Sequence, residues 1–339
     1  MLNTILLKFS TNLGTRNKEF TIIRWSSVSK PALGGIGFFI AFIMSIVYYS
    51  IFFHQQDIFL NKPFIGFVVA CISGFLIGLA DDAYNTNPLL KFLGQVTCGF
   101  ILIFTDTYIT IFDNQLLNYL LTIIWVIGIM NSINMLDNMD AITTVSSIGI
   151  ITVALMYLAT NNMIDYFDFL MMFGVLAALI GFLFHNWHPS KMYMGDTGSQ
   201  FLGIFLAFIG IKYLWNAPFP TSDFVTPQKI ILVAIAFVLP ISDTTTVTIN
   251  RLLKRQSPFV GGKDHTTHYL SYLGMSDSQI GFLYLGISAV SNLLCILIMN
   301  FIPEWKTSYT FIFGSYFLLV FSGLYFTTKS KFFRKLLKR

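Results

Sequence analysis

Long apolar runs, separated by short polar segments, dominate this sequence and limit what it can fold into. Residues 64–80, for example, include no charged residue and end at two adjacent carboxylates, Asp81 and Asp82. The runs are about 17 to 23 residues long, the length that a helix needs to cross the hydrocarbon core of a bilayer. They lack the period-2 alternation of a membrane-spanning barrel, so the pattern predicts a bundle of transmembrane helices.

The composition excludes an ordinary soluble domain. Of the 339 residues, 55% are hydrophobic and only 11% are charged, whereas soluble domains carry about 25% charged residues. We therefore predict an all-α, polytopic transmembrane bundle that forms a single domain over residues 1–339. Residues 1–32 are expected to form a short N-terminal segment, with a truncated or interfacial first helix. Residues 328–339 are expected to form a basic cytoplasmic tail that lies against anionic lipid.

The hydropathy pattern predicts ten membrane spans. The ten predicted spans are residues 33–53, 64–80, 89–105, 116–131, 141–160, 167–187, 199–215, 229–249, 279–301 and 308–327.

The basic residues are distributed unevenly between the two sides that these spans define. Seventeen of the 21 Lys and Arg residues fall in the N-terminal segment, in the loops after the even-numbered spans or in the tail. The four on the opposite side are Lys62, Lys212, Lys229 and Lys306. Since cytoplasmic loops carry the excess of Lys and Arg, the first side is predicted to face the cytoplasm.

Six carboxylates gather near helix ends on this predicted cytoplasmic side. They are Asp81, Asp82, Asp137, Asp140, Asp196 and Asp243. Acidic side chains at membrane depth are costly, and clusters of them indicate a functional site. Unpaired carboxylates that lie side by side in a low dielectric either become protonated or need a cation, and ligation by oxygen alone favours Mg²⁺, with Mn²⁺ as an alternative.

Basic side chains that could hold phosphate lie on the same side. They are Lys91, Arg251, Lys254, Arg255, His265 and His268. A hard metal ion, carboxylates and cations at a membrane surface together favour phosphoryl transfer between one substrate from water and one from lipid.

Local spacing supports a shared site, although each residue also has a structural interpretation. If their segment is helical, Asn134, Asp137 and Asp140 share one face, and each Asp could instead be a plain helix-end residue. In "MGDTGSQ", Thr197 or Ser199 is a candidate N-cap for the following helix.

Three further residues carry structural alternatives. Asp243 could pair structurally with Arg251 or with threonine hydroxyls. His185 and His188 are interpreted as interfacial residues beside Trp187.

Five motifs in a fixed order carry a resemblance to a known family. They are "SKPALGGIG", "GLADDAYNTNPLLKFLGQ", "NSINMLDNMDAI", "MGDTGSQFLG" and "PISD…R…QSPF…DHTTHYL". With these motifs the chain resembles the polyprenyl-phosphate N-acetylhexosamine-1-phosphate transferases, which include bacterial undecaprenyl-phosphate GlcNAc-1-phosphate transferases. The resemblance extends over nearly the whole chain.

The resemblance implies an activity and roles for the carboxylates. Such enzymes transfer a sugar 1-phosphate from a UDP-sugar to a polyprenyl phosphate and release UMP. Asp81 and Asp82 would then be catalytic, with Asp81 the better candidate for the base or orienting group. Asp196 would be the main Mg²⁺ ligand and Asp82 a second one. We expect direct attack by the lipid phosphate rather than a covalent aspartyl intermediate.

The remaining site residues are also assigned by resemblance. His265 would be catalytic, in contact with the pyrophosphate or sugar phosphate. The implied substrate-binding residues are Lys91, Asn134, Asp137, Asp140, Arg251 and His268.

Three departures from the family pattern affect these assignments. "DNMDA" stands where the family usually has Asp-Gly-x-Asp-Gly, so Asn138 and Ala141 replace glycines. A left-handed backbone is easier for Asn than for Ala. Thr267 occupies a position where the family often has His, and only "MLNTILLKFS" stands for the family's first helix.

The resemblance also implies substrates and partners. "NTNPLLKFLGQ" is similar to the GlcNAc-type enzymes, so UDP-GlcNAc and undecaprenyl phosphate are the expected substrates, with UDP-GalNAc or a deoxy-amino sugar as alternatives. The reaction would be the first membrane step of cell-envelope polysaccharide synthesis at the inner (cytoplasmic) membrane. Membrane lipid is an expected partner, nucleic acid is not, and a homodimer is left open.

Other functions remain as alternatives at this stage. Within the transferases, the chain could be a phospho-MurNAc-pentapeptide transferase or a member that has lost activity. A cation transporter would place acids near the bilayer midplane. An intramembrane aspartyl protease would need two facing acids and leaves the other motifs unexplained.

Overall fold

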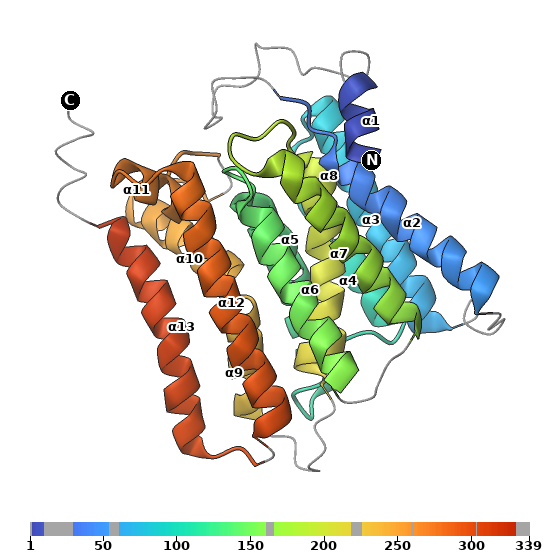
Figure 1. Ribbon diagram of the computed structural model, residues 1–339. Helices are drawn as coiled ribbons and strands as arrows, with labels where there is room; N and C mark the ends of the chain where they lie inside the picture. Colours follow the sequence, from blue (N-terminus) through green and yellow to red (C-terminus); the bar gives the residue numbers. More distant parts are fainter. Residues whose placement is uncertain are drawn as a thin grey trace.

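The computed structural model describes residues 2–9, 30–53, 61–160, 166–217, 226–258, 261–302 and 304–329. Within these ranges all the secondary-structure elements are helices, and the helices lie side by side as one bundle (Figure 1). The expected all-α bundle is therefore confirmed. The predicted basic tail beyond Lys329 and most of the predicted N-terminal segment fall outside the described residues.

The helices follow the predicted spans with small shifts at their ends. In chain order they are α1 (Leu2–Phe9), α2 (Gly34–Phe52), α3 (Lys62–Tyr84), α4 (Pro88–Phe104), α5 (Gln115–Leu136), α6 (Ile142–Thr160), α7 (Tyr166–Asn186), α8 (Gly195–Gly210), the π-helix η3 (Ile211–Trp215), α9 (Thr226–Ala236), α10 (Val238–Leu253), α11 (Thr266–Tyr272), α12 (Asp277–Phe301) and α13 (Thr307–Thr327).

Eight helices in the described residues are long and apolar enough to cross a membrane. They are α2, α3, α5, α6, α7, α8 with η3, α12 and α13. A ninth span would be the bent pair α9 and α10, and α4 is a shorter apolar helix. The chain is therefore a multi-pass membrane protein.

The predicted eighth span, 229–249, is wrong as one continuous helix. It is broken into α9 and α10, which meet at 83° around Phe237. Pro240 lies in the first turn of α10 and has no backbone N–H to donate to the carbonyl of Ala236. A proline is tolerated in a first turn but interrupts a continuous helix, which accounts for the position of the break.

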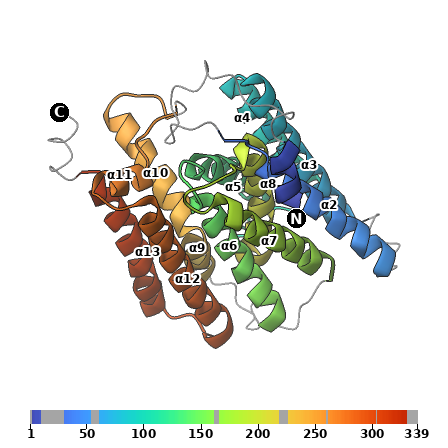
Figure 2. The ribbon, with the colours of Figure 1, turned by 45° about the horizontal axis from the view of Figure 1, so that its top comes forward.

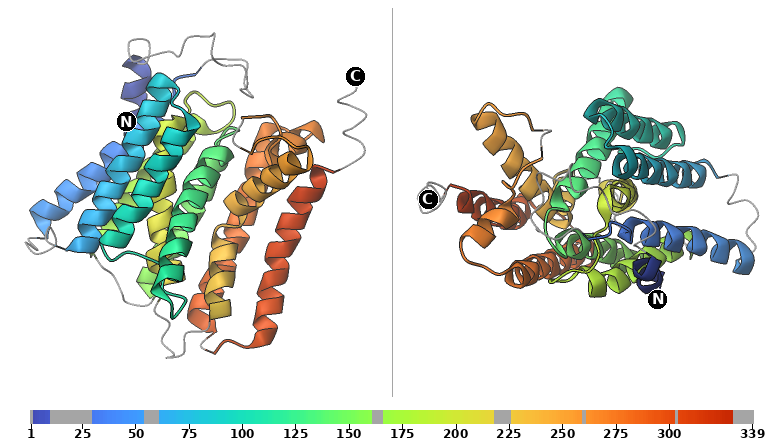
Figure 3. Two further views of the ribbon diagram at one scale, coloured as in Figure 1. Left: turned by 180° about the vertical axis from the view of Figure 1, so that it is seen from behind. Right: turned by 90° about the horizontal axis from the view of Figure 1, so that it is seen from above.

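Helix α8 lies at the centre of the bundle, as the view from above shows (Figure 3). Every residue from Thr197 to Gly210 is buried, against α3, α5 and α2. Small residues permit this packing. A Cβ atom on Gly35 of α2 would lie 2.2 Å from the Gly198 nitrogen, and one on Gly78 of α3 would lie 2.2 Å from the Asp196 carbonyl oxygen. Such close approach of helix backbones is typical of membrane bundles.

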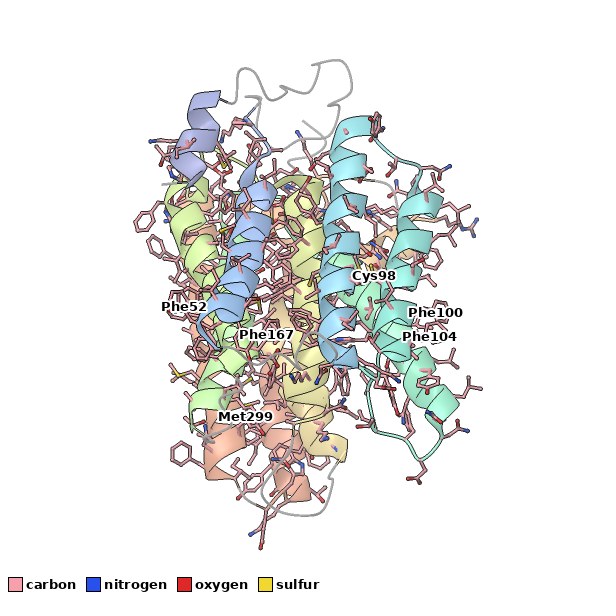
Figure 4. The ribbon with its side chains drawn as sticks, turned by 90° about the vertical axis from the view of Figure 1, so that its right-hand side faces the viewer. Phe52, Cys98, Phe100, Phe104, Phe167 and Met299 are labelled. Carbon is pink, nitrogen blue, oxygen red and sulfur yellow. The ribbon has the colours of Figure 1, made fainter. Side chains whose placement is uncertain are left out.

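The outer surface of the bundle is apolar. Phe100 and Phe104 lie on the outer edge of α4 and are 43% and 77% exposed, whereas Cys98 on the same helix is buried (Figure 4). An exposed aromatic surface of this kind suits contact with lipid. Cys71 and Cys295 are buried as well, so all three cysteines pack inside the bundle.

The polar ends of several helices meet at one end of the bundle. The start of α8, the end of α10 and α11 lie at the top of Figure 1, and Figure 2 tips this end toward the viewer. The ends of α3 and α5 and the start of α4 join them there through side-chain contacts. The predicted alternation of the chain across the membrane thus brings the candidate site residues to one end.

Candidate active site

Lys91, in the first turn of α4, joins three helices at this end of the bundle. Its Nζ donates to Asp81 Oδ2 of α3 at 2.7 Å. It also donates to Asn134 Oδ1 of α5 and to Asp196 Oδ1 of α8, both at 3.3 Å. The ammonium group is therefore held by two carboxylates and one amide. We refer to Asp81, Asp82, Lys91, Asn134 and Asp196 as the carboxylate site.

The turn between α3 and α4 places Lys91 over Asp81. Asn85 ends α3 with a left-handed backbone, φ 50°, which Asn adopts more readily than most residues. Asn87 then caps α4, and Pro88 occupies its first turn. Within this turn, Thr86 donates from its backbone nitrogen and its hydroxyl to Asp81 Oδ1, at 2.9 and 2.8 Å. Asp81 is thereby fixed on both oxygens.

Asp82 binds the start of α8. Its Oδ2 accepts from the backbone nitrogen and the hydroxyl of Thr197, both at 2.8 Å. The expectation that Thr197 or Ser199 caps α8 is therefore wrong. The helix begins at Gly195, after Met194, which offers no capping side chain. Asp82 of α3 takes that function instead, since a carboxylate at a helix N-terminus satisfies N–H groups and interacts favourably with the dipole.

Asp196 lies in the first turn of α8. Besides Lys91, its Oδ1 accepts from Asn134 Nδ2 at 2.5 Å. The same amide nitrogen donates to Ser199 Oγ at 2.8 Å. Asn134 therefore connects α5 to α8 at two points and fixes the orientation of Asp196.

The donor set of this site can be compared with the needs of Mg²⁺. Within the described ranges, no group of three or more His, Cys, Asp or Glu side chains is arranged to hold a metal ion. Asp82 and Asp196 nevertheless lie close enough to interact electrostatically. Mg²⁺ in proteins is commonly bound by one or two carboxylates together with substrate phosphates. A pair of carboxylates fits that pattern without a third protein ligand.

The loop after α5 differs from the expectation that Asn134, Asp137 and Asp140 share a helix face. Helix α5 ends at Leu136, Asp137 is its C-cap residue, and Asp140 follows in a turn. That expectation is wrong because the backbone leaves helical geometry at Asp137, whose ψ is 51°, and continues as a turn through Ala141, which has a left-handed φ of 68°. The chain thus departs from the helix before it reaches Asp140.

Asp140 lies in a separate polar cluster. Its Oδ1 accepts from the Ser190 hydroxyl at 2.7 Å, and its Oδ2 from the Ser190 nitrogen at 3.1 Å. The His188 ring nitrogen Nδ1 is 3.0 Å from Oδ2, and Lys30 Nζ is 4.0 Å away. Sequence reasoning assigned His188 to the interface and missed this pairing. The roles of Asp140 and Asp137 as substrate-binding residues stay predictions.

A second group of predicted residues surrounds Asp243 of α10, which is fully buried. His265 Nδ1 is 2.8 Å from Asp243 Oδ2, and Thr266 donates to Oδ1 from its nitrogen at 2.8 Å and its hydroxyl at 2.6 Å. The contact with Oδ2 sets the orientation of the His265 ring, and the Thr266 bonds to Oδ1 fix the Asp243 carboxylate. The Thr266 hydroxyl also lies 2.7 Å from the Tyr284 hydroxyl, so α10, α11 and α12 meet here.

Arg251 pairs with Asp264 rather than with Asp243, so the alternative of an Asp243–Arg251 pair is wrong. The guanidinium donates to both Asp264 oxygens, at 2.9 and 2.7 Å, and to the Pro258 carbonyl at 2.7 Å. Burial acts to raise the pKa of Asp264, but the Arg251 hydrogen bonds and charge outweigh burial and lower it. Sequence reasoning missed this partner of Arg251.

His268 is buried beside His265. Its Nδ1 accepts from the His265 backbone nitrogen at 3.3 Å, and its ring also interacts with the Asn138 backbone. Burial, and then the charge of His265, lowers the pKa of His268 to about 4. His268 is consequently neutral at pH 7.

The two groups of residues are connected through the loop after α5. Thr267 Oγ1 of α11 donates to Asn138 Oδ1 at 2.6 Å. Asn138 follows Asn134 of the carboxylate site by four residues, and Thr267 follows His265 by two. The structure thus brings Lys91, Asn134, Asp81, Asp82 and Asp196 together, and links the group around Asp243, His265 and His268 to them.

Comparison with known proteins supports the resemblance seen in the sequence. A family model described as glycosyl transferase family 4 matches residues 64–214. A probable undecaprenyl-phosphate N-acetylglucosaminyl 1-phosphate transferase of Bacillus subtilis (strain 168) is 27% identical over 329 residues, covering 91% of this chain and 86% of that protein.

Two further relatives are also named as transferases. A decaprenyl-phosphate N-acetylglucosaminephosphotransferase of Mycobacterium leprae is 27% identical over 289 residues, covering 77% of this chain and 71% of that protein. A phospho-N-acetylmuramoyl-pentapeptide-transferase of Campylobacter jejuni is 24% identical over 299 residues, covering 78% and 80%. The family match includes every residue of the carboxylate site.

Proposed function

We propose that this chain, a relative of glycosyl transferase family 4, transfers GlcNAc-1-phosphate from UDP-GlcNAc to undecaprenyl phosphate and releases UMP. One observation carries the proposal: Lys91 is held by Asp81, Asn134 and Asp196 where four helix ends meet at one end of an apolar bundle. A charged site at the edge of a membrane can receive one substrate from the lipid and one from water.

The charges of the site suit a reaction between two anions. A lipid phosphate that attacks a pyrophosphate must approach another negative group, and cations that screen both lower the barrier. Lys91 is the cation nearest the carboxylates, and its contacts with Asp81 and Asp196 keep it in place. In this proposal Asp81 orients Lys91 and the lipid phosphate, which attacks directly and expels UMP.

Magnesium, with manganese as an alternative, belongs to the proposal. Asp196 and Asp82 would hold the ion together with substrate phosphates, a common arrangement for Mg²⁺. When bound, the ion would neutralise charge on the transferring phosphoryl group. Asn134 orients Asp196 through the 2.5 Å hydrogen bond, and Asp82 fixes the start of α8 on which Asp196 lies.

The group around Asp243 would supply the second half of the site. The contact with Asp243 orients His265, which in the proposal binds the pyrophosphate or the sugar phosphate. Arg251 and His268 would support it through the loop that precedes α11 and through α11 itself. Asp137 and Asp140, on the loop after α5, would complete the nucleotide side.

The proposed location is the cytoplasmic (inner) membrane, with the active site facing the cytoplasm. The distribution of Lys and Arg, 17 against four between the two sides, supports this orientation. UDP-sugars are cytoplasmic metabolites in such a reaction, so the site and its water-soluble substrate would share a compartment.

The proposal is tested with purified protein, undecaprenyl phosphate, Mg²⁺ and labelled UDP-GlcNAc. We expect labelled lipid and an equal amount of UMP. Parallel reactions with UDP-GalNAc and UDP-MurNAc-pentapeptide identify the sugar. Faster turnover of either donor would show that this donor, rather than UDP-GlcNAc, is the substrate. Absence of lipid product with all three donors would contradict the proposed function.

A further inference from the structure

Three amide side chains form a polar layer inside the bundle. Gln95 Nε2 of α4 donates to Gln200 Oε1 of α8 at 3.1 Å and to Asn131 Oδ1 of α5 at 3.3 Å. Asn131 Nδ2 donates back to Gln95 Oε1 at 2.8 Å. We call Gln95, Asn131 and Gln200 the amide layer. It joins the same three helices that carry Lys91, Asn134 and Asp196.

The amide layer lies one helical turn below the carboxylate site. Gln95 follows Lys91 by four residues, Gln200 follows Asp196 by four, and Asn131 precedes Asn134 by three. Residues three or four apart share a helix face, and one turn corresponds to about 5.4 Å along the axis. Each helix therefore presents one residue to the carboxylate site and one to the amide layer.

Burying these amide side chains costs free energy. Gln95 is 1% exposed and Gln200 is fully buried. The direction of the Gln95–Gln200 bond fixes Gln200 Oε1 as the acceptor, and Gln200 Nε2 is then a buried donor with no partner in the parts of the chain that the structure describes. A buried unsatisfied donor costs free energy that an apolar side chain would not. The amide layer is thus poorly explained as a device for stability alone.

We propose that the amide layer is a positioning layer, which fixes the rotation of α4, α5 and α8 so that Lys91 remains between Asp81, Asn134 and Asp196. A rotation of α4 would move Gln95 and Lys91 together, because they share one face. The bonds from Gln95 to the other two helices oppose that rotation. The expected effect of the amide layer on turnover rests on the proposed function, whereas its effect on the position of Lys91 does not.

Turnover is expected to be sensitive to this geometry. A misplacement of about 1 Å at a reacting group can reduce the rate on the order of a hundredfold, even when the altered residue is distant from the chemistry. Lys91 reaches Asn134 and Asp196 at 3.3 Å, near the outer limit for a useful hydrogen bond. A small rotation would break both contacts.

The test uses Gln95→Leu, which removes the hydrogen bonds and keeps a side chain of similar length. Gln115→Leu is the matched control, since Gln115 is exposed at the first residue of α5, at the far end of the bundle. The first readout is independent of activity: acylation of each lysine in the purified protein, measured by mass spectrometry. Lys62, whose side chain is 72% exposed, is the internal reference.

Lys91 should be acylated slowly in the parent protein because its amine is held by three acceptors. Gln95→Leu should raise the ratio of Lys91 to Lys62 labelling by at least about fivefold, the factor that corresponds to the loss of one neutral hydrogen bond. Gln115→Leu should leave the ratio unchanged. An unchanged ratio in a folded Gln95→Leu protein would overturn the proposal, whatever reaction the protein catalyses.

The double variant Gln95→Leu with Gln200→Leu separates positioning from stability. Replacing both partners of a hydrogen bond with apolar groups can leave stability unchanged, so the double variant should unfold at or above the temperature of Gln95→Leu. Its kcat should stay reduced between about tenfold and a hundredfold, with KM for the UDP-sugar little changed. Recovery of kcat together with stability would mean that the layer is only structural.

Discussion

Thr267 Oγ1 donates to Asn138 Oδ1 over 2.6 Å, and this bond ties α11 to the loop after α5. Both residues are places where the sequence departs from the family pattern, and the structure shows that the two departures contact each other. His268 interacts with the backbone of the same Asn138. The loop after α5 is therefore held by two consecutive residues of α11.

Removing the hydroxyl from this contact should weaken the link. Thr267→Val keeps the shape of the side chain but leaves the side-chain oxygen Oδ1 of Asn138 without that donor, at a cost of about 1 to 2 kcal/mol in the free energy of unfolding. Thermal denaturation in detergent measures the effect. Thr97→Val, at an exposed position where the hydroxyl bonds only to its own helix, is the control. If Thr267→Val costs as much in an Asn138→Ala background, the two residues are not coupled.

Ala141 holds a left-handed backbone, φ 68°, at a buried position where its nitrogen donates to Asn186 Oδ1 at 3.1 Å. A left-handed conformation costs a residue with a Cβ roughly 1 to 2 kcal/mol. Ala141→Gly should therefore be neutral or stabilising by up to about 1 kcal/mol, after the entropy of the unfolded chain is counted. Ala141→Val should destabilise strongly. A large loss of stability in Ala141→Gly would contradict this account of the loop.

Gly78 lets α3 approach the backbone of Asp196. A Cβ there would lie 2.2 Å from the Asp196 carbonyl oxygen, so Gly78→Ala should displace the start of α8. We expect turnover to fall by at least about tenfold, since the displacement acts on a reacting group. Gly128→Ala in α5 is the matched variant, because a Cβ at Gly128 meets nothing within 4 Å. Equal turnover in the two variants would exclude this role for Gly78.

Acid should destabilise the protein through His268. Its pKa is about 4 when folded and about 6.5 when unfolded. The unfolded chain therefore binds a proton first as the pH falls, and stability is lost between about pH 6.5 and 4, by about 3 kcal/mol. His268→Asn should remove this part of the pH dependence, whereas His185→Asn should not. Equal slopes of unfolding temperature against pH in the parent and in both variants would contradict the assignment of this pH dependence to His268.

The sequence was sufficient for the bundle and for the end at which the candidate residues meet. Apolar length predicted the positions of the helices, and the alternation of the chain placed Asp81, Lys91, Asn134 and Asp196 together. It could not show the break at Phe237 in the predicted span, because residues 230–239 form one apolar run that continues through the break. Pro240 was the available signal, since it removes one backbone donor in a helix.

The polar contacts depend on how distant segments fold together. Spacing suggested that Asp137 and Asp140 continue the face of Asn134, but the helix ends at Leu136 and a turn begins at Asp137, whose ψ is 51°. The pairing of Asp140 with His188 and Ser190 depends on a contact between segments almost 50 residues apart, which spacing within one helix cannot reveal.

The central claim is that the carboxylate site performs the transfer, and Asp196→Asn tests it most directly. The measurement is the initial rate of labelled lipid formation from UDP-GlcNAc and undecaprenyl phosphate, with Asp113→Asn, an exposed Asp at the other end of the bundle, as the control. The account predicts a rate reduced by at least about a hundredfold in Asp196→Asn, with an unfolding temperature close to that of the parent. Turnover equal to that of Asp113→Asn would contradict it.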